Sequence, residues 1–201
     1  IFPPHHPYNS SKCLSCPHSH LNKPEGSEVS FGIVQDEICQ LCTRKYVIKH
    51  IETTSNGRII RAFENEIKAK DYQDRLEIAR FFANEMNEDV LLTPRINNPA
   101  KKLKHAEIYR SHYENNPEFR LKCPDQMVGD RFYEFKGYST KNMFNAFDNM
   151  IKSAQKQSTR IIIQDCKMSV GLMKRKIRER VLKGEKIEEV WVKKGSSMTL
   201  L

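Results

Sequence analysis

The stretch "CPDQMVGDRFYEFKGYST", residues 123–140, contains an Asp after a Pro, then a Gly-Asp turn, then a Glu and a Lys separated by one residue. The pattern predicts a β-hairpin with strands at 119–125 and 131–138 and a turn at 128–130. Residues i and i+2 of a strand share a face, so Glu134 and Lys136 should point the same way. The hairpin should return Asp125 to the side of Glu134, which brings two carboxylates together.

Two carboxylates this close repel each other unless a proton or a cation lies between them. Oxygen ligands suit Mg²⁺ or Mn²⁺, so Asp125 and Glu134 are the predicted ligands of a catalytic divalent cation. The Lys136 ammonium could then orient the attacking water and stabilise the developing negative charge. The alternative is an exposed ion pair on an edge strand, which would contribute well under about 1 kcal/mol.

The flanking sequence alternates helical and extended patterns. Apolar residues at steps of three and four predict helices at 71–86, 105–113, 140–157 and 169–185. Short apolar runs predict strands at 89–94, 159–165 and 186–194. This order predicts an α/β domain, with a mixed sheet flanked by helices, and Trp191 in its core.

The first segment is rich in Pro, Ser and His and has too few apolar residues for a core of its own. Two Cys-x-x-Cys pairs separated by 22 residues are typical of a zinc ribbon with four thiolate ligands. The predicted structural Zn²⁺ ligands are Cys13, Cys16, Cys39 and Cys42. A redox-active pair, or replacement of one Cys by His18 or His20, is the alternative. A hairpin around Asn56-Gly57 ends this module, which gives a zinc-ribbon-like module at 1–62 and a second domain at 63–201.

The chain of 201 residues carries a formal net charge of +9, which favours a polyanionic partner such as nucleic acid. The basic helix at 169–185 offers Lys174, Arg175 and Arg178 as phosphate contacts, although a solvated helix face would have the same pattern. No apolar run approaches the roughly 20 residues that span a bilayer. The chain begins with Ile and shows no signal sequence, so we expect a piece of a longer polypeptide.

Pro124-Asp125, eight residues, and then Glu134-Phe135-Lys136 resemble the motif of the PD-(D/E)xK phosphodiesterase superfamily. This resemblance implies a restriction-endonuclease-like core, with Asp125 and Glu134 as metal ligands and Lys136 as the catalytic lysine. It also implies that Gln157 lies near the scissile phosphate. The first helix of such proteins often supplies another acid, for which Glu77 is the best match and Asp74 and Glu66 are alternatives.

The wider pattern from Glu64 to the C-terminus resembles the CdiA C-terminal tRNA-nuclease toxin domains of contact-dependent growth inhibition. The resemblance implies a Mg²⁺-dependent tRNase, delivered as part of a longer secreted protein into the target-cell cytoplasm, and a cognate immunity protein. Two alternatives stay open. The same core could belong to a DNA endonuclease or resolvase, or the chain could be a zinc-containing protein that binds nucleic acid without cutting it.

Overall fold

The computed structural model describes residues 47–96, 102–114, 116–137, 143–164 and 167–201. All of these belong to the second of the two units into which the chain divides, Ile1–Arg44 and Lys45–Leu201. The four cysteines predicted to bind zinc lie outside the described residues, so the zinc site stays a prediction.

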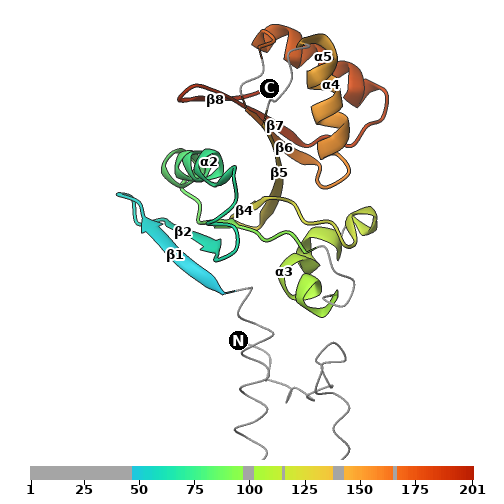
Figure 1. Ribbon diagram of the computed structural model, residues 1–201. Coiled ribbons are helices and arrows are strands. Elements are labelled where there is room, and N and C mark those ends of the chain that lie inside the picture. Colours follow the sequence, from blue (N-terminus) through green and yellow to red (C-terminus); the bar gives the residue numbers. More distant parts are fainter. Residues whose placement is uncertain (1–46, 97–101, 115, 138–142, 165–166) are drawn as a thin grey trace, which may run out of the picture. The chain divides into compact units, whose positions relative to one another are not determined.

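The described part of the chain forms a single eight-stranded mixed sheet with helices on both faces (Figure 1). The strands are β1 (Ile48–Thr53), β2 (Ile59–Phe63), β3 (Val90–Leu92), β4 (Gln126–Val128), β5 (Arg131–Gly137), β6 (Arg160–Gln164), β7 (Glu189–Lys194) and β8 (Ser197–Leu200). The helices are α2 (Tyr72–Glu85), α3 (Lys102–Glu114), α4 (Met143–Ala154) and α5 (Val170–Leu182), with a 3-10 turn η3 (Pro117–Phe119). The predicted mixed sheet flanked by helices is confirmed. Strand β8 was not predicted.

The strands lie in the sheet in chain order. Helices α2, α4 and α5 each connect two parallel neighbours, namely β2 to β3, β5 to β6 and β6 to β7. All other neighbouring pairs are antiparallel. Parallel strands need such a long crossover, whereas short turns join the antiparallel pairs β1–β2, β4–β5 and β7–β8. The antiparallel pair β3–β4 is joined by the longer connection that contains α3.

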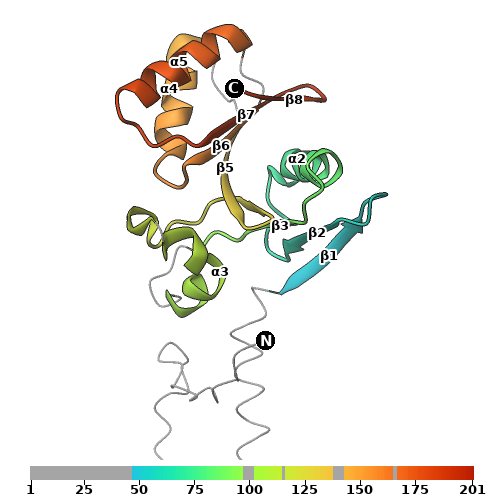
Figure 2. The same ribbon diagram turned by 180° about the vertical axis from the view of Figure 1, so that it is seen from behind.

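Alternation along the strands divides the apolar side chains between the two faces. On one face, Tyr133, Phe135 and Trp191 pack against α2. Trp191 meets the Phe82 ring at a centroid distance of 5.5 Å, which confirms its predicted place in the core. The other face packs against α4 and α5 through residues that include Ile161, Ile163, Val190 and Val192. Figures 1 and 2 show α2 and the α4–α5 pair on different sides of strands β5 to β7.

Helix α2 buries its predicted apolar stripe against the first face. Leu76, Ala79, Phe82 and Ala83 are buried, whereas Met86 is exposed because it lies at the C-cap, beyond the last helical turn on the sheet. No helix in the described ranges is long and apolar enough to cross a membrane.

The predicted hairpin forms, but its first strand is later than expected. Residues 117–119 form the turn η3, and the strand is Gln126–Val128 rather than 119–125. Gly129, at φ +57, provides the left-handed turn residue. Gln126 pairs with Tyr133 in the antiparallel register, so Asp125, one residue earlier, comes opposite Glu134. The predicted approach of Asp125 to Glu134 is therefore confirmed.

The hairpin predicted to close the first module lies in the sheet instead. Strands β1 and β2 form it, with Gly57 at φ +82 in the turn, and β2 pairs in parallel with β3. The Asn56 amide also donates to the Ala83 carbonyl of α2 at 2.9 Å. These contacts make β1 and β2 part of the unit Lys45–Leu201, and the extent of the zinc-ribbon-like module stays a prediction.

Candidate active site

Glu134 and Lys136 lie on the face of the sheet opposite α2, and Asp125 lies beside Glu134, one residue before β4. Both carboxyl residues are almost fully buried, with 2% of Asp125 and 4% of Glu134 exposed. The Lys136 Nζ atom lies 2.5 Å from Glu134 Oε1, and the lysine side chain is 27% exposed. The exposed ion pair considered from the sequence is therefore wrong, because this pair lies beside a second buried carboxylate.

Burial and the neighbouring Asp125 carboxylate raise the pKa of Glu134 to about 8, despite the opposing effect of Lys136. Glu134 Oε2 is buried and has no hydrogen-bond donor among the described residues. A proton or a cation shared with Asp125 would relieve this repulsion. The geometry thus leaves an oxygen suited to a cation.

Asp125 is fixed by backbone contacts on both sides. Its Oδ2 accepts from the Phe135 amide at 3.0 Å, and its own carbonyl accepts from the Thr93 amide at 3.0 Å. These bonds join β3, β4 and β5 at the point where β3 ends and β4 begins. They hold the carboxylate in one position without using its Oδ1.

Arg75 is a fully buried arginine behind this carboxylate. Its Nη2 lies 2.8 Å from Glu66 Oε2 and 3.6 Å from Asp71 Oδ1. Its Nη1 donates to the Asp125 carbonyl at 3.3 Å and lies 3.8 Å from Asp125 Oδ1. One guanidinium therefore connects the start of α2 with the site. The apolar pattern of α2 gave no indication of it.

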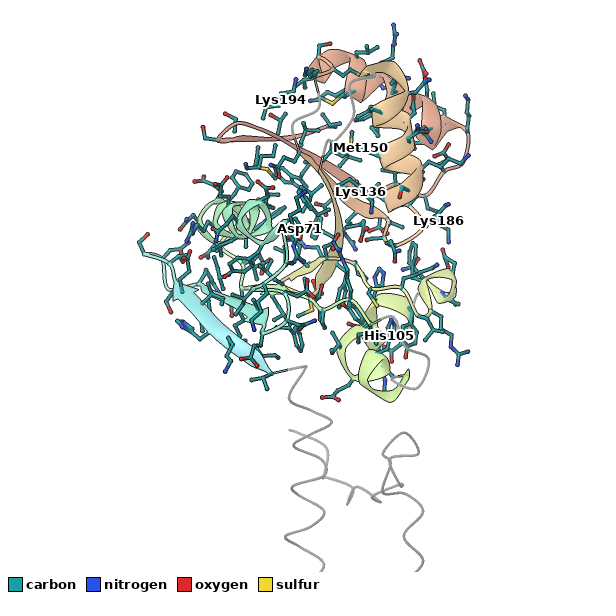
Figure 3. The ribbon with its side chains drawn as sticks, viewed as in Figure 1. Asp71, His105, Lys136, Met150, Lys186 and Lys194 are labelled. Carbon is teal, nitrogen blue, oxygen red and sulfur yellow. The ribbon has the colours of Figure 1, made fainter. Side chains whose placement is uncertain are left out.

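Asp71 and Arg95 complete this network on its exposed side. Arg95 Nη2 lies 3.2 Å from Asp71 Oδ2 and 3.1 Å from Asp125 Oδ1. Asp71 occupies the N-cap position of α2 but makes no side-chain cap hydrogen bond there. An Asp at a helix start normally caps the helix, which is why the sequence did not single it out. Figure 3 shows Asp71 and Lys136 in the middle of this unit, whereas His105 and Lys186 lie nearer its edges.

The first-helix acid predicted from the resemblance does not reach the site. Glu77 is 57% exposed and pairs with Lys193 at 2.8 Å, and Asp74 accepts from Gln164 at 2.8 Å. By strand alternation, Lys193 and Gln164 lie on the α2 face, opposite Glu134 and Lys136. Of the three candidate acids, Glu77, Asp74 and Glu66, only Glu66 belongs to the network around Asp125, through its ion pair with Arg75.

Gln157 follows α4 and lies close to the segment that carries Asp125. Its side-chain Oε1 accepts from the Cys123 amide at 3.3 Å, and its carbonyl lies 2.6 Å from His112 Nε2. The described contacts support a role in positioning the 123–125 segment. Contact with substrate stays a prediction.

The structure divides the cations of α5 into two groups. Lys176 and Arg180 are turned toward α4, where both pair with Asp148. Lys174, Arg175 and Arg178, the three predicted phosphate contacts, are exposed. Within the described ranges, Arg175 makes an exposed 3.7 Å pair with Glu179, which contributes little. These three side chains are thus available to a partner.

The oxygens of the Asp125–Glu134 pair suit a divalent cation. Both residues offer hard oxygens, and Glu134 Oε2 has no hydrogen-bond donor in the part of the chain that the structure describes. The described residues contain no group of three or more His, Cys, Asp or Glu side chains placed to hold a metal.

The raised pKa of Glu134 predicts how stability depends on pH in buffer free of Mg²⁺ and Mn²⁺. Between about pH 4.5 and pH 8 the folded protein keeps a proton on Glu134 that the unfolded chain has lost. Stability should therefore fall as pH rises through this window and change no further above it. Since one pKa unit corresponds to about 1.4 kcal/mol, the expected loss is on the order of a few kcal/mol.

Glu134→Gln should remove this pH dependence and make the metal-free protein more stable at pH 8.5. Urea unfolding at several pH values measures it, and the fluorescence of Trp191, the single Trp of the chain, reports on the sheet alone. A Glu134→Gln protein with wild-type stability at every pH would contradict the predicted repulsion.

Comparisons with known proteins add little to this geometry. No family model and no curated protein matches the chain. A solved structure, a CdiA-CT/CdiI toxin and immunity complex from Burkholderia pseudomallei, is similar over 66% of this chain and 81% of its own, at 16% identity and a TM-score of 0.41. A TM-score this low supports no inference about fold or function, so those inferences come from the site.

Proposed function

We propose that the chain is a divalent-metal-dependent nuclease that hydrolyses phosphodiester bonds, with an active site of the PD-(D/E)xK type. The observation that carries the proposal is the buried Asp125–Glu134 pair with Lys136 Nζ 2.5 Å from Glu134. Burial of like charges costs stability, and such costly clusters are found mainly at functional sites. The motif resemblance assigns the same three residues.

Each residue of the site has a distinct task in this proposal. Asp125 and Glu134 would hold the cation, which would supply Lewis-acid stabilisation of a phosphoryl oxygen and lower the pKa of a coordinated water. Lys136 orients the attacking water and stabilises the negative charge of the transition state. Arg75 holds Asp125 in place from behind, and Gln157 holds the backbone two residues before it.

The substrate is proposed to be nucleic acid, with tRNA favoured and DNA as the alternative. The charge of +9 and the exposed cations of α5 support a polyanion. The preference for tRNA, a toxin role, delivery into a target cell and an immunity partner rest on the motif resemblance alone. The first segment is proposed to hold one structural Zn²⁺ through its four cysteines.

Charge reversal on α5 tests the proposed phosphate contacts. The double variant Arg175→Glu/Arg178→Glu should weaken nucleic-acid binding and reduce the slope of log affinity against log salt, by roughly 0.7 to 0.9 per lost contact. Fluorescence anisotropy without divalent cations measures both quantities. The control is Lys49→Glu/Arg61→Glu, the same charge change on β1 and β2, far from α5 in the strand order. Equal affinities and slopes for the two double variants would show that the exposed cations of α5 face solvent and do not contact phosphate.

A substrate panel tests the class of reaction. The full chain is incubated in Mg²⁺ with a tRNA pool, a supercoiled plasmid and a branched DNA. Cleavage of the tRNA pool supports the favoured substrate, and cleavage of either DNA supports the endonuclease alternative. Binding to all three without cleavage would contradict the proposed nuclease.

A further inference from the structure

Arg95 differs from every other cation of the site in what it joins and in how freely it can move. Its Nη2 bridges Asp71 Oδ2 and Asp125 Oδ1, at 3.2 and 3.1 Å. Its side chain is 56% exposed, whereas Arg75, on the same carboxylate, is 0% exposed. Arg75 is therefore fixed in the core, and Arg95 can turn into solvent without disturbing it.

The backbone of Arg95 is anchored independently of its side chain. The Arg95 amide donates to Glu66 Oε1 at 3.3 Å, and Glu66 is held in turn by Arg75. A guanidinium that moves away from Asp125 would therefore stay attached at this pivot. It would also still have Asp71 within reach as a second carboxylate.

The bridge competes directly with a cation. Asp125 Oδ2 is used by the Phe135 amide, so Oδ1 is the oxygen that a metal ion would take. The Arg95 guanidinium contacts that oxygen and places a positive charge beside it. A cation and this guanidinium cannot both use Oδ1 fully, because they would repel each other at contact distance.

We propose that Arg95 guards the cation site: its guanidinium substitutes for the divalent ion on Asp125 and, when the ion binds, exchanges Asp125 for a phosphate of the substrate. The arginine stays paired with an anion throughout this exchange, because it leaves the Asp125 carboxylate for a phosphate of the substrate. The metal ion and the polyanion then bind cooperatively. The metal ion releases Arg95 for a phosphate, and a phosphate that binds Arg95 keeps it away from Asp125. The inference rests on the proposed nuclease function and assigns Arg95 as a substrate contact.

The first test measures Mg²⁺ affinity by calorimetry in zinc-loaded full-length protein without nucleic acid. Arg95→Gln should bind Mg²⁺ about tenfold or more tightly than the wild type, because a charge-assisted hydrogen bond no longer has to be broken. The control Arg80→Gln removes the same charge from an arginine that is 46% exposed and pairs with Glu52 away from the site. It should change the affinity less than about threefold, as a screened surface charge does.

The second test measures coupling in a Lys136→Ala background, in which cleavage should be slowed about a hundredfold or more. A saturating short RNA oligonucleotide should raise the Mg²⁺ affinity about tenfold when Arg95 is present and leave it nearly unchanged in Arg95→Gln. Mg²⁺ binding to Arg95→Gln that is equal to or weaker than binding to the wild type would overturn the guard. Mg²⁺ binding to neither protein would overturn the nuclease proposal as well, so the two failures are distinguishable.

Discussion

Lys136→Ala should lose nuclease activity by about a hundredfold or more while it keeps most of its affinity for Mg²⁺. Electrostatic groups that act on the transition state contribute effects of this size. The lysine contacts the proposed ligand Glu134 but carries no oxygen that could bind the cation. Initial rates of cleavage and calorimetric Mg²⁺ titrations on the same preparation measure the two properties.

The control for this variant is Lys193→Ala. Lys193 is also a largely buried lysine in ion-pair contact with a glutamate, but it lies on the α2 face with Glu77. Its removal should leave the rate within a few-fold of the wild type. Asp125→Asn and Glu134→Gln, in contrast, should lose Mg²⁺ binding and cleavage together. Full activity in Lys136→Ala would show that the Glu134–Lys136 ion pair has no catalytic role.

Arg75→Met should destabilise the sheet by about 3 to 5 kcal/mol, the cost of leaving a buried charge without its partner. The change leaves Glu66 and Asp125, exposed to only 4% and 2%, without the guanidinium that lies between them. Urea unfolding followed by Trp191 fluorescence measures the loss. Arg80→Gln, which breaks a half-exposed pair with Glu52, should cost no more than about 1 kcal/mol.

A double variant keeps this prediction testable if Arg75→Met folds poorly. Glu66→Met/Arg75→Met removes both charges of the 2.8 Å pair and fills similar volume. It should recover part of the lost stability, because buried ion pairs can often be replaced by apolar residues. A double variant that is less stable than Arg75→Met alone would show that Asp125, rather than Glu66, determines the need for the arginine.

The local parts of this site could be predicted from the sequence. Glu134 and Lys136 share a face because the strand period is two, and Gly129 supports the turn that returns Asp125. The helices and buried strands followed from apolar spacing. The first strand of the hairpin was placed too early because "FRLKCPD", residues 119–125, alternates apolar and polar residues. Its backbone is instead irregular after the 3-10 turn that ends at Phe119.

The long-range parts could not be predicted. Asp71 has the position of a helix cap, Arg75 stands within an apolar helix face, and Arg95 follows a strand in a polar segment. Each becomes part of the site only in the folded sheet, where α2 forms the crossover between the parallel strands β2 and β3. Glu77 was chosen by its position in the first helix, but it lies on the side of α2 that faces Lys193 and forms an ion pair with it.

We propose that the Asp125–Glu134–Lys136 cluster makes the chain a metal-dependent phosphodiesterase. The most direct measurement is the cleavage of a labelled tRNA pool by zinc-loaded full-length protein, with and without added Mg²⁺, beside Lys136→Ala. Cleavage should require Mg²⁺ and fall about a hundredfold or more in the variant. Cleavage at the same rate without divalent cation, or by Lys136→Ala at the wild-type rate, would contradict it.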